Sequence, residues 1–316
     1  MLQVALHAHR RIALPPETWV LVDAYRARLE FGDLTDPAGR ERLADWLLAR
    51  PKLRDLGLPP EDLRARVLAA PPTLGSALGV LLQGYAERFD KPRWGDKRPA
   101  YYRDVAAVLR LFPDAQFVHL VRDGRDCVAS LQRMRWWKQG PLAAMATWVE
   151  AVDYGEHWRR TLGPGTWHEM RYETLVAEPE RELRGLCAFL GEEYDDAMTA
   201  PDTVASVAVP SRKTWHTRTG GAMDSTRVSA YRTGLTAEEL ALLERVAGAR
   251  LERRGYRLDG GGTVAPRLLA DYAAVAARRR LAHRKQHALD LVRDRRAGAP
   301  VAARLTSAQL ARPAGT

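Results

Sequence analysis

An apolar run that ends abruptly in charged residues constrains the fold of this chain more than any other feature. Residues 116–121 read QFVHLV, and the charged turn RDGRD follows at once and leads into a helical pattern. A turn at Pro113 and Asp114 precedes the run. A short apolar run between turn signals predicts a buried strand. A strand that passes directly into a helix is typical of an α/β domain.

A second strand is predicted at residues 166–171, after a Gly-Pro-Gly turn. Residues 142–161 lie between the two strands and predict a long helix with one apolar side, formed by Met145, Trp148, Val149 and Val152. Strand, helix and strand in this order indicate a crossover between parallel strands. We therefore expect an α/β fold in which helices flank a parallel sheet.

Most of the remaining chain shows helical patterns. Residues 33–89 are predicted to be mostly helical between proline breaks, and residues 179–190 form an amphipathic helix. Residues 236–251 predict another helix, with a capping box between Thr236 and Glu239. Residues 196–234 are rich in Ser, Thr, Gly and Pro and predict a long loop region.

Positive charge is concentrated at the end of the chain. The formal charge is +10, but residues 267–316 hold eleven Lys or Arg against three Asp, so the other residues are nearly neutral. We expect a domain at residues 1–258 and a basic tail at 259–316, helical over 267–296 and disordered over 297–316. A basic tail on a balanced domain gives little reason to expect nucleic acid as the partner.

Other classes of protein are disfavoured by what the sequence lacks. No apolar run approaches the ~18 residues of a membrane span, and the first residues lack the apolar core of a signal peptide. We therefore expect a cytoplasmic protein without a transmembrane segment. Cys127 and Cys187 lie far apart without partners at metal-ligand spacing, so we expect buried thiols, no disulfide framework and no metal site.

The charged turn after the first strand is a candidate anion site. Ligands of open α/β sheets bind at the carboxyl ends of the strands. A phosphate at this turn would meet the guanidinium groups of Arg122 and Arg125, free N–H groups of the first helical turn and the hydroxyl of Ser130. The alternative is a surface network in which the two arginines pair with Asp123 and Asp126.

Residues 112–130, FPDAQFVHLVRDGRDCVAS, resemble the 3′-phosphate-binding segment of sulfotransferases that use 3′-phosphoadenosine-5′-phosphosulfate (PAPS). The tyrosylprotein sulfotransferases and many bacterial members are the most similar branch. The resemblance extends to WGDKRP at 94–99, to residues 170–191 and 215–256, and to LHAHRRIALPPETW at 6–19. It covers about residues 1–258 and implies a P-loop-like sulfotransferase fold with PAPS as co-substrate.

The same resemblance assigns roles to individual residues. Arg122 and Ser130 align with residues that hold the 3′-phosphate, and Tyr172 aligns with a tyrosine near the nucleotide. Arg227 aligns with a residue of the family's closing segment, residues 215–256 in this chain, that reaches the nucleotide. From the residues alone, Tyr172 is equally a core aromatic. The donor-binding residues implied are therefore Arg122, Ser130, Tyr172 and Arg227.

Two further residues are implied on the catalytic side. Glu17 aligns with the proposed general base, and Lys97 with a lysine that balances charge on the sulfuryl group or the leaving phosphate. As alternatives, Glu17 is a residue at a helix start, and Lys97 forms a surface pair with Asp96. The scheme needs no metal, and the acceptor is a small molecule or carbohydrate with a hydroxyl or amine.

The family's glycine-rich loop, of the form PRSGTT, does not occur in this sequence. Met1 aligns with residues just after that loop, so we expect a chain truncated before its first strand and 5′-phosphosulfate loop, with low stability and little activity. Two other functions stay open. One is a noncatalytic protein that binds a nucleotide or partner through the 3′-phosphate pocket, and the other is a polyanion-binding protein that uses the basic helix from Arg278 to Arg296.

Overall fold

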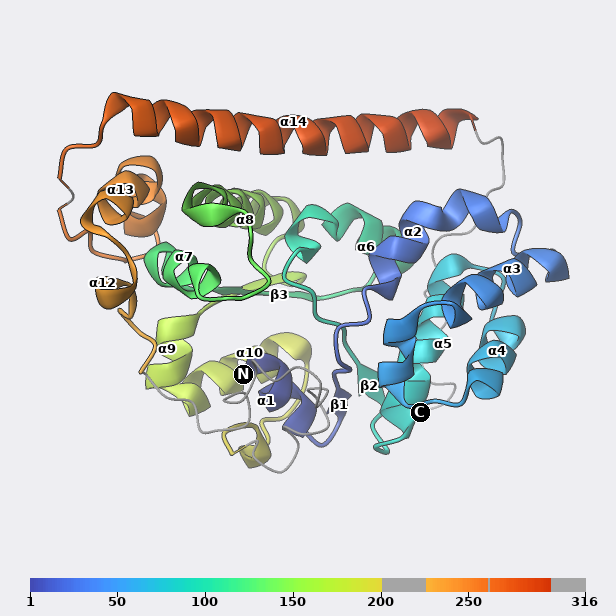
Figure 1. Cartoon of the computed structure of the whole chain (residues 1–316). Helices are drawn as coiled ribbons and strands as arrows, with labels where there is room; N and C mark the ends of the chain where they lie inside the picture. Colours follow the sequence, from blue (N-terminus) through green and yellow to red (C-terminus); the bar gives the residue numbers. More distant parts are fainter. Residues whose placement is uncertain (201–225, 261, 297–316) are drawn as a thin grey trace. The chain divides into compact units, whose positions relative to one another are not determined.

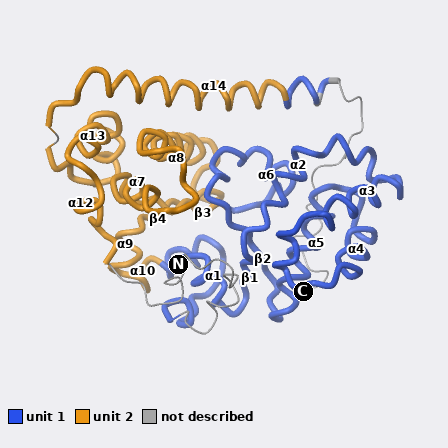
Figure 2. The backbone as a smooth tube through the Cα atoms, in the orientation of Figure 1, with its two compact units in different colours: residues 1–116, 183–223, 290–316 blue, residues 117–182, 224–289 orange. Residues whose placement is uncertain are grey.

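The computed structural model describes residues 1–200, 226–260 and 262–296. The chain divides into two compact units, shown in different colours in Figure 2. The first unit comprises residues 1–116 with the described parts of 183–223 and 290–316, and the second comprises 117–182 with the described parts of 224–289. Each unit has its own short parallel strand pair.

The second unit is built on the strand, helix and strand that the sequence predicts. Strand β3 (Phe117–Val121) pairs in parallel with β4 (Trp167–Arg171). Helix α7 (Gly124–Gln132) follows β3, and α8 (Gly140–Leu162) makes the crossover (Figure 1). Helix α9 (Tyr172–Ala177) begins directly after β4. The predicted strand and helix bounds are confirmed to within one or two residues.

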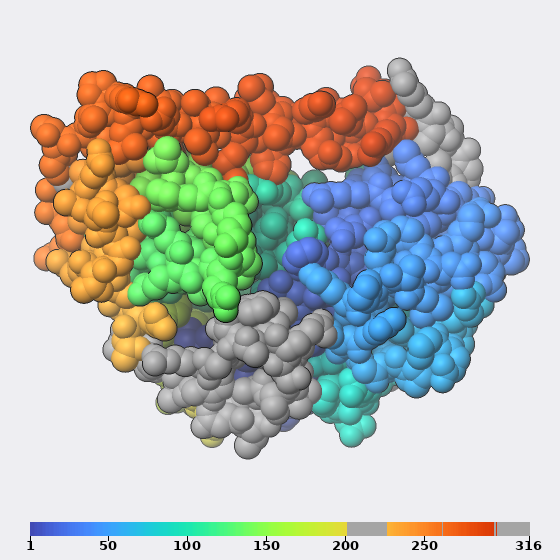
Figure 3. Space-filling view, viewed as in Figure 1, coloured from blue at the N-terminus to red at the C-terminus, as the bar shows by residue number. Residues whose placement is uncertain are grey.

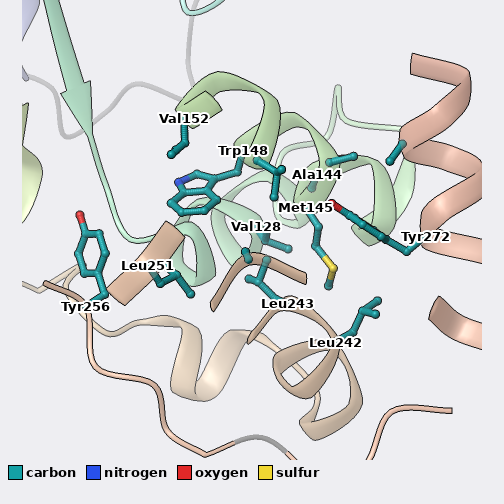
Figure 4. Close-up of a cluster of buried hydrophobic side chains, with 14 residues drawn as sticks. Val128, Ala144, Met145, Trp148, Val152, Leu242, Leu243, Leu251, Tyr256 and Tyr272 are labelled. Carbon is teal, nitrogen blue, oxygen red and sulfur yellow. The ribbon is translucent and has the colours of Figure 1, made fainter. Parts of the chain in front are cut away.

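The apolar side of α8 forms the main core of the second unit. Met145 and Trp148 are buried there, against side chains from α7, from α13 (Ala237–Glu252) and from α14 (Pro266–Arg296) (Figure 4). The predicted capping box of α13 is present. Burial of this shared apolar cluster holds α7, α8, α13 and the beginning of α14 together.

The predicted basic helix is present as α14, and its beginning belongs to this core. Tyr272 is 9% exposed and Ala276 is 8% exposed, both within the cluster around Met145. The aligned part of the chain was expected to end at residue 258, and that boundary stays a prediction. The predicted disorder at 297–316 lies outside the described residues.

Helices dominate the first unit, and residues 33–89 are helical as predicted. Its helices are α1 (Leu2–Ala8), α2 (Val20–Phe31), α3 (Pro37–Leu48), η1 (Pro51–Leu56), α4 (Pro60–Ala69), α5 (Leu74–Glu87), η2 (Tyr101–Arg103), α6 (Val105–Leu111) and η3 (Asp196–Met198). Helix α10 (Pro179–Leu190) matches its predicted bounds and spans the boundary between the units. Helix α5 is buried along most of its length and forms the centre of the first unit's core.

The strands of the first unit are short. Strand β1 (Ile12–Ala13) pairs in parallel with β2 (Arg93–Trp94). Within the described residues, no helix has both the length and the apolar composition needed to cross a membrane.

Candidate functional site

The parallel register of β3 and β4 brings two predicted site residues together. Val121 pairs with Arg171, so the next residues, Arg122 and Tyr172, leave neighbouring strand ends. The Arg122 guanidinium carbon lies 4.7 Å from the centroid of the Tyr172 ring, a cation–π contact. Both residues stand at the carboxyl ends of the strands, as predicted for an anion site.

Backbone and side-chain groups hold Arg122 in place. Its Nη2 donates to the carbonyl oxygen of Arg227 and lies 3.4 Å from Oδ2 of Asp126. The Arg122 side chain is 20% exposed, and its Nε atom is buried with no hydrogen-bond partner among the described residues. An anion at this strand end would meet the exposed part of the guanidinium, since the Nε atom itself is covered.

Asp126 fastens the closing segment to this turn. Its carboxylate is 1% exposed and accepts backbone N–H groups of Ser229 (3.0 Å) and Tyr231 (2.8 Å). The sequence predicts a loop region at residues 196–234, but its last residues form the short helix α12 (Tyr231–Gly234). Residues 201–225 of the predicted loop region lie outside the described residues. Arg227 reaches Arg122 through its carbonyl oxygen, while its side chain is exposed.

The expectation that Arg125 offers a second guanidinium to a phosphate is wrong. Arg125 is 3% exposed and donates to both carboxylate oxygens of Asp123 and to Glu244, the latter at 2.7 Å. Its guanidinium also lies 4.3 Å from the ring centroid of Tyr231. The alternative pairing of Arg125 with Asp123 is present, but it is buried, because α13 supplies Glu244 from the other side.

Tight packing fixes the start of α7. A Cβ atom on Gly124 would lie 2.7 Å from the Trp148 ring, so only glycine fits without a shift. The indole N–H of Trp148 donates to the carbonyl of Arg122 at 2.9 Å, and the Asp123 carboxylate caps α7 by accepting the N–H of Arg125. The backbone N–H of Asp123 donates to Glu173 at 2.9 Å.

Ser130 and Cys127 lie further along α7. The Ser130 side chain is half-buried, on the helix that begins at the charged turn. Burial raises the pKa of the Cys127 thiol to about 12, so this thiol stays protonated, in line with a structural role. Cys187 is buried, and its thiol lies 3.5 Å from the Met198 sulfur.

In the first unit, the pairing of β1 with β2 brings Glu17 to Lys97. Both strands run in the same direction, and Glu17 and Lys97 follow them after four and three residues. The Lys97 ammonium forms an ion pair with the Glu17 carboxylate. Glu17 is 18% exposed and Lys97 is 39% exposed, so the pair is accessible on the lysine side.

The alternative pairing of Lys97 with Asp96 is wrong. Asp96 instead accepts the hydroxyl hydrogen of Tyr101, and its Oδ1 atom is buried without a partner among the described residues. Burial raises the pKa of Asp96, and the Tyr101 hydrogen bond opposes this rise. The Lys97 ammonium is therefore paired with Glu17, although its charge still acts to lower the pKa of Asp96.

Trp19 stands beside this pair and was not singled out from the sequence. Its indole N–H donates to Glu17 at 3.3 Å, its ring is contacted by the Lys52 ammonium 2.7 Å from the centroid, and Arg98 lies at 5.0 Å. Trp19 has a φ of 64°, a left-handed conformation that is costly for a bulky residue. No local sequence pattern predicts the left-handed conformation of Trp19.

The comparison with protein families decides the assignment. A model of the Sulfotransferase family matches residues 1–196. The chain belongs to the sulfotransferase family. That match includes the strand end at Arg122, the helix with Ser130 and the Glu17 and Lys97 pair, and it leaves Arg227 outside.

Curated sulfotransferases resemble shorter stretches of this family member. A protein-tyrosine sulfotransferase of Drosophila melanogaster is 31% identical over 112 residues, which are 34% of this chain and 22% of that protein. An omega-hydroxy-beta-dihydromenaquinone-9 sulfotransferase of Mycobacterium tuberculosis is 29% identical over 107 residues, 30% of this chain and 28% of that protein. The matched stretches thus span about a quarter of the length of these relatives.

Solved sulfotransferase domains have the same fold. The sulfotransferase domain of the curacin biosynthetic pathway matches with a TM-score of 0.55 at 19% identity, covering 81% of this chain and 93% of that domain. The sulfotransferase domain of the Synechococcus PCC 7002 olefin synthase matches with a TM-score of 0.52 at 23% identity, covering 78% and 89%. The predicted α/β sulfotransferase fold is confirmed.

Proposed function

We propose that this sulfotransferase-family chain moves a sulfuryl group from PAPS to a hydroxyl or amine acceptor. The observation that carries the proposal is the place of Arg122 at the end of β3. Its guanidinium is held by the Asp126 carboxylate and the Arg227 carbonyl, it contacts the Tyr172 ring, and its side chain is 20% exposed. A 3′-phosphate is an acceptor of the right charge for such a donor.

Tyr172 and Arg227 contact Arg122, and Ser130 takes its proposed role from the resemblance to the family. Tyr172 offers an aromatic face at the same strand edge, and Ser130 offers a hydroxyl on α7. Arg227 belongs to the segment that Asp126 fastens to the turn. PAPS would supply the sulfuryl group, and PAP would leave with negative charge on its 5′-phosphate. The protein would therefore align the donor with the acceptor and stabilise that charge.

The Glu17 and Lys97 pair is proposed to handle the proton and the charge of the reaction. A carboxylate held by an ammonium is a weak base, because protonation would remove a favourable ion pair. On this proposal Lys97 balances negative charge on the sulfuryl group or the leaving phosphate, and Glu17 accepts the proton of the acceptor hydroxyl or amine.

Donor recognition is tested by comparing two nucleotides. We expect the chain to bind 3′-phosphoadenosine-5′-phosphate (PAP) at least about tenfold more tightly than AMP, because only PAP carries the phosphate that Arg122 would hold. Isothermal titration calorimetry measures both affinities. Equal affinities for PAP and AMP would contradict the proposed role of the strand-end site.

The Glu17 and Lys97 pair is tested through binding. We expect Lys97→Met to weaken PAP binding by roughly fivefold, since a half-exposed charge near a phosphate contributes about 1 kcal/mol. Glu17→Gln should keep or slightly strengthen PAP binding, because it releases Lys97, and should abolish transfer of label from PAPS. Loss of PAP binding in Glu17→Gln would show that Glu17 supports the fold and is no base.

A further inference from the structure

Helix α14 exposes an unusual number of large apolar side chains. The structure has six large exposed hydrophobic residues among those it describes, and four are on this one helix: Leu281, Leu289, Leu291 and Val292. Leu281 is 63% exposed. Single exposed leucines are ordinary, but a group of four on one helix marks an interaction surface.

The exposed residues lie opposite the side of α14 that packs on the core. Successive residues of an α-helix are about 100° apart, so Leu281 is turned about 180° from Tyr272, which is buried. Arg279 and His283 continue the inner side and contact Glu150 on α8. Figure 1 shows α14 as one continuous helix, and Figure 3 shows its side chains at the surface of this view.

Basic residues lie among the apolar side chains on the same side of α14. Arg278 and Lys285 lie about 40–60° from Leu281 on one side and Arg284 about 60° on the other, and all three are exposed. The only acidic residue between 278 and 293 is Asp290, nine positions from Leu281 and therefore about 180° away, on the inner side. We call Arg278, Leu281, Arg284, Lys285 and Leu289 the outer face of α14.

We propose that the outer face of α14 binds the surface of an anionic lipid bilayer. A basic helix lies flat on such a surface when its apolar side chains enter the headgroup region and its Lys and Arg meet lipid phosphates. Nucleic acid would use the charges but not Leu281 and Leu289, and the outer face has no aromatic residue to stack on bases. The apolar and basic residues together therefore select lipid. This inference goes beyond sulfuryl transfer and does not depend on it.

Vesicle sedimentation of the full chain tests the proposal. We expect binding to vesicles of equal parts phosphatidylcholine and phosphatidylglycerol, and little binding to phosphatidylcholine alone. The triple variant Arg278→Gln/Arg284→Gln/Lys285→Gln should lower the partition coefficient at least about tenfold, since each basic residue near an anionic surface contributes roughly a fivefold factor. The variant Leu281→Ser/Leu289→Ser should also lower it at least about tenfold.

A charge-matched control is available on other surfaces of the second unit. Arg245, Arg253 and Arg257 are exposed, and their replacement by Gln removes the same charge. This control should keep the partition coefficient within about twofold, because electrostatic attraction falls off within a Debye length. Circular dichroism checks that each variant is folded.

Three results would overturn the proposal. The first is equal binding to neutral and anionic vesicles. The second is unchanged vesicle binding by Leu281→Ser/Leu289→Ser together with binding of duplex DNA, which indicates a general polyanion site. The third is an oligomer in the absence of lipid that dissociates in the same variant, without vesicle binding, which assigns the outer face to a second copy of the chain.

Discussion

Replacing Arg122 with methionine is expected to weaken PAP binding by roughly 30- to 100-fold, the loss of about 2–3 kcal/mol that hydrogen bonds to a charged group contribute. Affinity for AMP should stay within about threefold, because AMP lacks the 3′-phosphate. Methionine keeps much of the aliphatic stem, so contact with the Tyr172 ring is partly retained. Isothermal titration calorimetry of both nucleotides measures the change.

The matched control for this substitution is Arg160→Met. Arg160 lies on α8 in the same unit, and its side chain is 70% exposed. Arg160→Met removes the same charge at a position away from the strand end, so the affinities for PAP and AMP should stay unchanged. If Arg122→Met and Arg160→Met bind PAP equally well, the 3′-phosphate is held elsewhere and the proposed function loses its main support.

Replacing Arg125 with methionine is expected to lower the free energy of unfolding by about 3–5 kcal/mol, the effect of removing one partner from a buried ion pair. The substitution leaves the carboxylates of Asp123 and Glu244 buried without their cation. Both have side chains less than a tenth exposed. Urea unfolding followed by circular dichroism measures the loss.

Two further variants serve as controls for the unfolding of Arg125→Met. Arg159→Met removes an exposed arginine that pairs with Glu156, and its unfolding midpoint should match the unsubstituted chain. The double variant Arg125→Met/Glu244→Met should recover part of the lost stability, since it removes one of the stranded charges. If Arg125→Met unfolds at the same midpoint as Arg159→Met, the buried network is energetically unimportant.

The sequence predicts the elements around the candidate site well, because each carries a local signal. The QFVHLV run, the Gly-Pro-Gly turn and the apolar side of residues 142–161 are enough to predict β3, β4 and α8. The capping box of α13 is likewise a short-range pattern of Thr236 and Glu239. Signals of this kind depend on neighbours within a few residues.

The roles of the two arginines in RDGRD depend on distant residues and were only half predicted. Arg122 and Arg125 look equivalent in sequence, yet Arg125 is turned inward by Glu244, 119 positions away. Asp126 likewise finds its backbone partners more than 100 positions along the chain. Such partners have no local pattern, so sequence reasoning placed both arginines at the anion.

The contact between Glu17 and Lys97 is another long-range feature that the sequence does not reveal. Resemblance to the family suggested both residues, but nothing in the sequence shows that they contact each other across 80 positions. The local alternative, a pair of Lys97 with Asp96, failed because Asp96 bonds to Tyr101. Trp19, in contact with Glu17, escaped notice because its unusual backbone conformation has no sequence marker.

The long-range partners of Asp126 and Arg125 determine when the strand-end site can form during synthesis of the chain. A nascent chain that has emerged only as far as α8 already has the whole charged turn, yet the Ser229 and Tyr231 amides and the Glu244 carboxylate have not been made. Domains form as their sequences leave the ribosome, but contacts of large sequence separation must wait. The strand-end site is therefore completed only once α13 has been synthesised, and prematurely terminated chains lack the finished site at which we propose that the nucleotide binds.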